Sequence, residues 1–450
     1  MKTSYRKLIS LTFAFLIIAS CNSKKSLDTF ESSENITISN STNNYYQNFV
    51  INKADDIFLE DLSKKAFKYF IEQSDPTTGL VLDRSPTNGG VSKTNIASSA
   101  STGFGLSAFC IGLERGWISK SEARKKVFTT LKFFAEKAPQ EHGWFLHFMD
   151  KSTGARRWES EYSSIDTALF LAGVLTAKQY FKSDAEIVKL ATTIYERVDF
   201  KWMLNAHPSL LSHGWTPEKG FIPYRWDTYS EHMILQMLAI GSPTNPIPSS
   251  AWNAWKRTEI TYGNYNYINS GPLFTHQYSP SYIDFRHQKD NSSELKTDFF
   301  VNSIKATKAH KEFCLSLSKE FPAYSENIWG ITASDSAKGY VAWGGPPLEP
   351  EIDGTVVPCA AGGSLMFTPD ISIPALKEMK EKYGKTIYAR YGFVDAFNPN
   401  NSWVGPDVIG IDVGITLLSA ENLRTGNIWK WFMQNKEIPN AMKNVGLEKY

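Results

Sequence analysis

The chain has 450 residues, 42% of them hydrophobic and 21% charged, which is ordinary for a globular protein. A formal net charge of +2 argues against a nucleic-acid binder, because such a protein needs a basic stripe. The aromatic content of 14% is the unusual value. A large aromatic core would account for most of these rings, but flat rings with polar edges also suit sugars.

The N-terminus predicts an export signal with a lipid attachment site. Basic residues among the first seven precede an apolar run over residues 8–18, which is too short to cross a membrane and typical of a signal peptide. Residues 18–21 read Ile-Ala-Ser-Cys and resemble a bacterial lipobox. We therefore expect a signal peptide over residues 1–20 and a lipid on Cys21. A plain secretory signal with a chance cysteine is the alternative.

The next segment predicts a tether and then a single domain. Residues 21–50 are rich in Ser and Asn and have little to bury, so we expect a lipidated cysteine followed by disorder. No second linker interrupts residues 51–450, which predicts one catalytic domain. Asn22 stands where an Asp would retain a lipoprotein at the inner membrane in some bacteria. The expected location is the outer membrane, with the lipid as the only membrane contact.

The remaining cysteines do not predict a metal site. They are odd in number, far apart and without metal-ligand spacing, so at most one disulfide can form among Cys110, Cys314 and Cys359. Cys110 lies in an apolar run and predicts a buried free thiol. The eight histidines are dispersed. We expect no metal and no cofactor.

Two kinds of predicted helix alternate along the chain. Amphipathic segments have one apolar face, whereas the others are apolar nearly all round and must be buried on every side. The amphipathic segments are 57–73, 120–135, 184–203 and 305–321, and the fully apolar ones are 102–113, 164–175, 230–240 and 413–421.

This alternation predicts an all-α fold, the (α/α)6 toroid with long functional loops. The buried helices begin near residues 102, 164 and 230, a spacing that fits helical hairpins arranged as an inner and an outer ring. Strands with period-two alternation are scarce. The pattern is least clear between residues 290 and 385, so the count of six hairpins is partly assumed. Long loops are usually functional in a compact domain. Here they span 79–96, 141–162, 213–229, 262–289, 329–365 and 391–411.

Residues 158–166 contain the first candidate catalytic carboxylates. Ser163 or Ser164 suits a helix N-cap, which would place Asp166 in the first turn of an inner helix. Glu161 precedes the cap and would project from the loop. A helix dipole also favours a carboxylate at this place, which is the purely structural interpretation of Asp166.

Residues 224–232 contain the second candidate group. Glu231 stands where the next apolar segment begins, and apolar surroundings raise the pKa of a carboxyl group into the range of a general acid. The structural alternative is that Glu231 interacts with the helix dipole in the first turn or is part of a capping box. Tyr224, Arg225 and Trp226 of the same segment are candidate sugar contacts.

Further loop residues combine Asp, Arg and aromatic rings, a set that suits a ligand rich in hydroxyl groups. Each is weak evidence alone, because ion pairs are common in loops. The sequence has no HExxH, no GxGxxG after a strand, no Walker loop and no GxSxG elbow. The candidates of this kind are Asp83, Arg84, Trp158, His276, Gln277, Tyr278, Arg286, Trp343 and Trp403.

Several loop motifs resemble the "putative glucoamylase" domain. They follow in the same order over roughly residues 55–435. The stand-alone lipoprotein form is similar to glycoside hydrolase family 144, the endo-β-1,2-glucanases. The motifs are GPLFTHQY at 271–278, DFR at 284–286, WGITASD at 329–335, GGPP at 344–347, DGT at 353–355, YGFVDAF at 391–397, GIDVG at 410–414 and EN at 421–422.

The resemblance implies an (α/α)6 fold and inverting hydrolysis of β-1,2-linked glucan or gluco-oligosaccharides. Some relatives release the disaccharide sophorose instead of cutting within the chain. The same domain occurs in much larger cyclic β-1,2-glucan synthases, but nothing in this sequence resembles a glycosyltransferase. We also expect a monomer that binds no nucleic acid.

Inversion needs one carboxylic acid and one carboxylate, about 6.5–9.5 Å apart. We expect Glu231 to be the acid and either Glu161 or Asp166 the base. A non-catalytic glycan-binding lipoprotein that feeds an oligosaccharide importer is the alternative from another class. A lyase is a third possibility, but it would need an acidic uronate substrate and a more basic cleft.

Overall fold

The computed structural model describes residues 45–46, 49–90, 92, 94–346 and 352–450. The chain divides into two units, Met1–Tyr46 and Gln47–Tyr450, and all of the helices and strands named below belong to the second unit. The predicted signal peptide, Cys21 and nearly all of the predicted tether lie outside the described residues.

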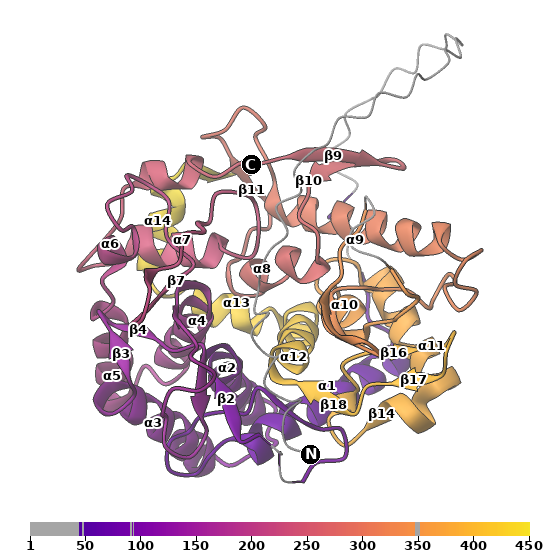
Figure 1. The fold of residues 1–450 in the computed structure, drawn as a ribbon, viewed down its shortest axis with the longest axis horizontal. Coiled ribbons are helices and arrows are strands. Elements are labelled where there is room, and N and C mark those ends of the chain that lie inside the picture. Colours follow the sequence, from indigo (N-terminus) through magenta and orange to yellow (C-terminus); the bar gives the residue numbers. More distant parts are fainter. Residues whose placement is uncertain (1–44, 47–48, 91, 93, 347–351) are drawn as a thin grey trace. The chain divides into compact units, whose positions relative to one another are not determined.

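Helices buried along most of their length form an inner ring (Figure 1). In the part of the chain that the structure describes there are six: α2 (Ser99–Glu114), α4 (Ser164–Tyr180), α7 (Met233–Gly241), α8 (Tyr278–Tyr282), α10 (Pro358–Gly362) and α12 (Gly410–Thr425). Helix α2 packs on α4, α4 on α7, α7 on α8, and both α8 and α10 on α12, which returns to α2. The side chain of Gln277 joins α8 to α10 through a 2.9 Å hydrogen bond to the Ala360 carbonyl oxygen.

Amphipathic helices cover this ring from outside. In α3 the buried residues Ala123, Val127, Leu131 and Phe134 recur every three to four positions, so one face meets the inner helices. The outer helices are α1 (Lys53–Gln73), α3 (Lys120–Glu136), α5 (Ala185–Glu196), α9 (Phe299–Ser316) and α11 (Pro369–Ile387), with the shorter α6 (Phe200–Met203) and α14 (Glu437–Asn444). The short helix α13 (Asn427–Phe432) packs on the inner helices α4, α8 and α12. Outer and inner helices alternate from α1 to α5 and again from α9 to α12, whereas α7 and α8 follow one another within the inner ring.

The strands are short, antiparallel and confined to the loops. Three of them lead directly into inner helices, since β2 precedes α2, β6 precedes α4 and β18 precedes α12. The loops therefore gather at the N-terminal ends of the inner helices. The paired strands are β1 (Arg84–Pro86) with β18 (Asp407–Ile409), β2 (Ile96–Ser98) with β5 (Phe148–Asp150), β3 (Gln140–Glu141) with β4 (Trp144–Phe145), β6 (Tyr162–Ser163) with β7 (Gly214–Thr216) and β8 (Gly220–Phe221), β9 (Glu259–Tyr262) with β10 (Tyr265–Ile268), β11 (Gln288–Asp290) with β19 (Leu447–Lys449), β12 (Ala333–Ser336) with β13 (Gly339–Ala342), β14 (Tyr388–Ala389) with β15 (Gly392–Phe393), and β16 (Phe397–Asn398) with β17 (Trp403–Val404).

Helices α2 and α4 touch through their backbones. A Cβ atom at Gly173 would lie 2.0 Å from the carbonyl oxygen of Gly103, and one at Gly103 would lie 2.4 Å from that of Leu169. No side chain fits at either position. This contact fixes the position of α4, which carries Asp166.

Replacing Gly173 by alanine is therefore expected to lower the free energy of unfolding by about 3 kcal/mol, because the two backbones must move apart. Urea denaturation measures the change. Gly384→Ala in α11 is the matched control, because a Cβ there makes only ordinary contacts of 3.5 Å and 3.8 Å. The control should be neutral or slightly more stable. Equal stability of the two variants would contradict the tight contact.

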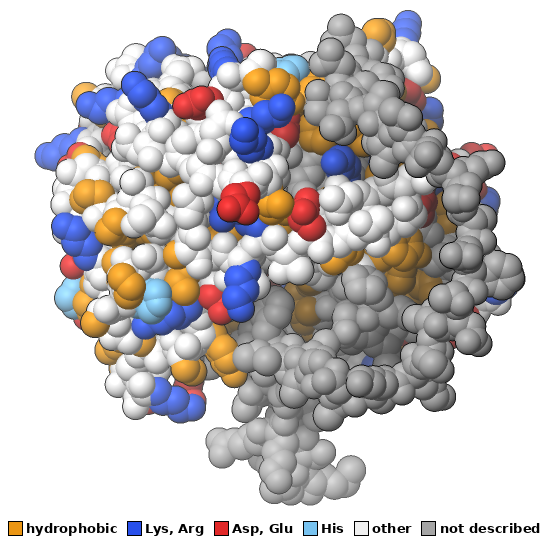
Figure 2. Space-filling view, turned by 90° about the horizontal axis from the view of Figure 1, so that it is seen from above, with side chains coloured by type: hydrophobic (Ala, Val, Ile, Leu, Met, Phe, Trp, Pro, Cys, Tyr) orange, Lys and Arg blue, Asp and Glu red, His pale blue; other side chains and the backbone are white. Residues whose placement is uncertain are grey.

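The cysteines and the surface charges of the described residues are those of an ordinary globular protein. Cys110, Cys314 and Cys359 are buried and unpaired, and burial raises the pKa of the Cys110 thiol, so the predicted buried free thiol is confirmed. Lys, Arg, Asp and Glu side chains are interspersed on the face seen in Figure 2. Among the described helices, none has both the length and the apolar character that a membrane span requires.

Candidate active site

The N-terminal end of α4 holds the first carboxylate in a fixed position. Ser163 is the N-cap, and its hydroxyl accepts a hydrogen bond from the Asp166 backbone N–H at 3.2 Å. The same hydroxyl donates to Asp166 Oδ2 at 2.6 Å. Asp166 thus lies in the first turn of an inner helix, as predicted, and its side chain is oriented by the cap.

His147 joins Asp166 to Glu161. Its Nδ1 lies 3.0 Å from Glu161 Oε1 and its Nε2 lies 3.5 Å from Asp166 Oδ1. The ring stacks on Phe148 with 3.7 Å between centroids. The backbone N–H of His147 also donates to the Glu161 carbonyl oxygen at 2.9 Å, so the two loop segments are held together. We call His147, Glu161 and Asp166 the histidine–carboxylate cluster.

Opposing effects set the ionisation of this cluster. Burial would lower the pKa of His147, but the charges of Asp166 and Glu161 outweigh burial and raise it to about 9. His147 is therefore an imidazolium at neutral pH. Burial acts to raise the pKa of Glu161, but the charge of His147 and its hydrogen bond prevail, and that pKa lies below its usual value. For Asp166 burial prevails over His147, and the pKa is raised.

The same three side chains are the described residues that could hold a metal ion, since one ligand atom from each lies within 4.8 Å of the others. They would supply one nitrogen and two oxygens. At neutral pH such an ion would have to displace a proton from His147, because both ring nitrogens are protonated in the imidazolium. Protonation and metal binding compete at this site.

Glu231 is a buried carboxyl group in the turn that leads into α7. It is hydrogen-bonded to the Ser230 hydroxyl, and the Ser279 hydroxyl donates to its carbonyl oxygen. Burial raises the pKa of Glu231, the bond from Ser230 opposes this, and the charge of Asp166 raises it further. The N-cap of α7 is His232, so Glu231 is not the residue that caps the helix. The capping interpretation does not hold, and Glu231 suits a protonated acid.

Asp83 and Arg84 border the same region. Burial raises the pKa of the Asp83 carboxyl, and the charges of Arg84 and His147 oppose it. The Nε atom of Arg84 lies 3.5 Å from Asp83 Oδ2. Its Nη1 donates a hydrogen bond of 2.8 Å to Asp335 Oδ2. Asp83 is therefore within the electrostatic field of the histidine–carboxylate cluster, in agreement with its selection from the sequence.

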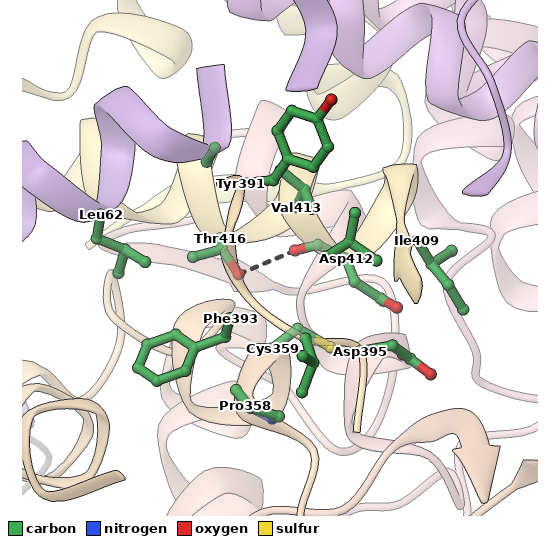
Figure 3. A pocket seen from close by; sticks show the side chains of 13 residues that line it. Leu62, Pro358, Cys359, Tyr391, Phe393, Asp395, Ile409, Asp412, Val413 and Thr416 are labelled. Carbon is green, nitrogen blue, oxygen red and sulfur yellow. Dashed lines mark hydrogen bonds between the residues drawn. The ribbon is translucent and has the colours of Figure 1, made fainter. Parts of the chain in front are cut away.

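A second acidic pair lies behind Asp335. The backbone N–H of Asp335 donates to Asp395 Oδ2 at 2.8 Å. Asp395 and Asp412 line a small pocket together with Cys359 (Figure 3). Burial and the charge of Asp412 raise the pKa of Asp395 well above its usual value. Burial raises the pKa of Asp412 to about 6, although hydrogen bonds from Asp395 and Cys359 oppose the rise. Two buried carboxyl groups that affect each other in this way are expected to titrate as a unit.

The raised pKa of Asp412 predicts a pH-dependent stability. The folded pKa of Asp412 is about 6 and its ordinary value is 3.8, so the folded chain binds the proton more tightly. The resulting stabilisation is complete below the lower value and is lost as the pH rises through the upper one. Asp412→Asn should flatten this part of the stability profile in urea denaturation from about pH 4 to about pH 7. The control is Asp370→Asn in the first turn of α11, which is exposed. An unchanged slope in Asp412→Asn would contradict the raised pKa of Asp412.

Two of the predicted aromatic contacts lie exposed near the cluster. Trp158 is 46% exposed, and its ring lies 5.1 Å from that of Phe148, which stacks on His147. Tyr224 is 43% exposed. Trp226 is buried instead, and its indole N–H donates to the Ser164 hydroxyl at 2.9 Å, so it supports the start of α4.

Other predicted contacts serve the fold. The Arg225 guanidinium donates to the carbonyl oxygens of Leu204 and Leu210 at 2.8 Å and 2.6 Å and holds its loop in place. His276, Gln277 and Tyr278 are buried at the start of α8. These polar side chains have a structural role, because polar groups buried inside the ring need hydrogen-bond partners. Tyr278 still interacts electrostatically with Asp412 and Glu231.

Arg286 lies away from the cluster. It forms a two-bonded ion pair with Asp284, at 2.8 Å each, and stacks over Trp429 at 4.1 Å. These residues line a polar hollow beside the C-terminal end of α12, whereas the cluster is at the N-terminal ends of the inner helices. The prediction that Arg286 contacts the sugar is therefore not supported by its position. Of the remaining candidates, Trp343 is buried and Trp403 is half-buried at the start of β17.

Sequence reasoning missed His147, Asp335, Asp395 and Asp412 as site residues. A signal was present for Asp412, because it occupies the first turn of a buried helix, as Asp166 does. His147 lies in a long loop, but a single histidine among eight has no distinguishing pattern.

Comparison with known proteins finds a family model that matches part of the chain. Residues 223–436 match the family model described as "putative glucoamylase". The resemblance inferred from the loop motifs is therefore confirmed.

Similar proteins extend the match over most of the chain. An exo β-1,2-glucooligosaccharide sophorohydrolase (non-reducing end) from Parabacteroides distasonis is 29% identical, with 87% of this chain and 58% of that protein covered. The chain thus spans little more than half the length of that curated relative. The endo-β-1,2-glucanase of Chitinophaga pinensis, solved with sophorotriose and glucose, has a TM-score of 0.82 and 27% identity, covering 88% of this chain and 99% of the other. A structure from Bacteroides fragilis, described as a putative glucoamylase, has a TM-score of 0.81 and 29% identity, and the match covers 88% of this chain and 98% of the other. The predicted all-α (α/α)6 fold is confirmed.

Proposed function

We propose that this protein is a glycoside hydrolase that cleaves β-1,2-linked glucan or β-1,2-gluco-oligosaccharides. The observation that carries the proposal is the histidine–carboxylate cluster at the start of α4, in which His147 lies 3.0 Å from Glu161 and 3.5 Å from Asp166. Glu231 at the start of α7 is a further buried carboxyl group, and the charge of Asp166 acts on it. The relatives support the linkage, because two of them are named for hydrolysis of β-1,2-glucans.

The reaction inverts the configuration at the anomeric carbon. Glu231 donates its proton to the glycosidic oxygen as the bond from that oxygen to the anomeric carbon breaks. Water attacks the anomeric carbon from the opposite face and gives a proton to a carboxylate. Glu161 is the better base of the two candidates, because the His147 charge holds it ionised, while Asp166 is bonded to the Ser163 hydroxyl.

Binding is supplied by the groups around the cluster. The exposed rings of Trp158 and Tyr224 offer flat apolar faces for glucose units. Asp83 and Arg84 offer an acceptor and donors to neighbouring sugar hydroxyl groups. The ends of the cleft decide between endo action and release of sophorose.

Product analysis tests this function directly. Thin-layer chromatography after incubation with linear β-1,2-glucan should show short oligosaccharides or sophorose, and none from β-1,3- or β-1,4-glucan. EDTA should leave the yield unchanged, because the two carboxyl groups suffice. Absence of product from every glucan would favour the glycan-binding lipoprotein, and a uronate polymer would then test for a lyase.

We also propose that the protein is exported and anchored by a lipid. The protein is a monomer anchored to the outer membrane by lipid on Cys21, with the glucan as its partner. The Ile-Ala-Ser-Cys motif supports the anchor. Metabolic labelling with palmitate should mark the protein and fail in Cys21→Ser; equal labelling would contradict it.

A further inference from the structure

Tyr340 is an exposed aromatic residue that the proposed mechanism does not use. It lies on the hairpin formed by β12 and β13 and is 47% exposed, as much as Trp158 and Tyr224. Its hydroxyl has no hydrogen-bond partner among the described residues. A large ring in this state leaves a flat face free for a ligand.

The hairpin register directs this ring toward Arg84. Tyr340 is paired directly with Asp335 across the two strands, and side chains of such a pair project to the same face. Asp335 reaches Arg84 from that face, with 2.8 Å between Oδ2 and Nη1. Arg84 is itself held opposite Ile409, the N-cap residue of α12, through the pairing of β1 with β18. The ring of Tyr340 therefore leaves the hairpin on the side where the loops meet the inner helices.

Electrostatic interactions connect Tyr340 with charged groups beside the histidine–carboxylate cluster. It interacts with Asp412, Asp395, Asp83 and Arg84. Asp83 in turn interacts with His147 and with Asp166. The ring thus stands beside charged groups that continue into the histidine–carboxylate cluster.

We propose that Tyr340 forms one wall of a glucose-binding subsite and stacks on a sugar ring whose hydroxyl groups bond to Asp83 and Arg84. This inference rests on the proposed function and adds a specificity-determining residue to it. Tyr340 binds substrate and takes no part in proton transfer. Its loss therefore raises KM and lowers affinity, while kcat changes little.

Calorimetric titration with a β-1,2-linked glucose pentasaccharide tests the subsite. The parent is Glu231→Gln, which prevents turnover during the measurement. Adding Tyr340→Ala should weaken binding about tenfold, which is a free-energy change of about 1.4 kcal/mol. Adding Tyr340→Phe should preserve binding, because the flat face remains. Adding Tyr340→Leu should weaken it, since the side chain stays apolar but loses its planar ring.

Ile57→Ala in the same parent is the surface control, because Ile57 is exposed on α1, and it should bind like the parent. Thermal unfolding of every variant separates lost binding from lost folding. Parent-like affinity of a folded Tyr340→Ala variant overturns the subsite alone. Loss of affinity in Tyr340→Phe equal to that in Tyr340→Ala overturns stacking. Failure of the parent to bind any β-1,2-glucan overturns the proposed function as well.

Discussion

Glu231→Gln is expected to lower kcat on linear β-1,2-glucan by about 10³-fold while the affinity for the glucan stays within about twofold. The amide has nearly the shape of the carboxyl group and can still bond to Ser230, but it cannot give a proton to the glycosidic oxygen. Burial favours the protonated form that this step needs, since it raises the pKa of Glu231. Reducing-sugar release gives kcat, and calorimetric titration gives the affinity.

Glu159→Gln is the matched control for this result. Glu159 lies in the loop that also carries Glu161, but it is exposed. Its turnover should equal that of the unmodified protein. Near-normal turnover of Glu231→Gln would remove Glu231 from the catalytic set and leave Asp166 as the acid to be tested.

His147→Gln is expected to lower kcat/KM by about 10²-fold, because Glu161 and Asp166 lose the group that positions both. The pH profile should change as well. In the unmodified protein the imidazolium holds the pKa of Glu161 below its usual value, so Glu161 stays ionised in mild acid. Without this charge the pKa of Glu161 rises, and the acidic limb of the profile moves to higher pH.

His142→Gln separates this effect from the general loss of a histidine. His142 also stacks on an aromatic ring, that of Trp202 at 4.4 Å, and its Nε2 lies 3.5 Å from Glu141 Oε1. It is 45% exposed, so solvent screens its interaction with Glu141. The control should keep the profile of the unmodified protein. An unshifted acidic limb in His147→Gln would show that His147 does not control the ionisation of Glu161.

The fold could be predicted because its pattern is local. Residues 102–113 and 164–175 are apolar on every side, and only an inner helix buries such a segment, as α2 and α4 do. The inner helices α8 and α10 have only five residues each, which is too short for a helical period to appear in the sequence. Because α10 lies between residues 290 and 385, the hairpin pattern is unclear in that part of the chain.

The candidate site could be predicted for those residues whose position depends on where a helix begins. Asp166 follows a capping serine, and Glu231 precedes an apolar segment, so both positions can be deduced from neighbours in the sequence. Long-range packing decides the others. Arg286 and Arg84 belong to similar loop motifs, but only the folded ring shows that they lie at different helix ends. The bond from His147 to Glu161 depends on the path of a loop that no short pattern specifies.

The pairing of β1 with β18 has a consequence for the order of folding. Beside this pair the Thr87 hydroxyl donates to the carbonyl oxygen of Pro406 at 2.7 Å, and the two residues are 319 positions apart in the chain. Contacts between such distant segments form late, because a large loop must close before they contribute. The loop with Asp83 and Arg84 therefore reaches its final place only when α12 docks against α2. During refolding, helical content should return before hydrolysis does, and a chain arrested before this docking would have its helices but only part of its binding cleft.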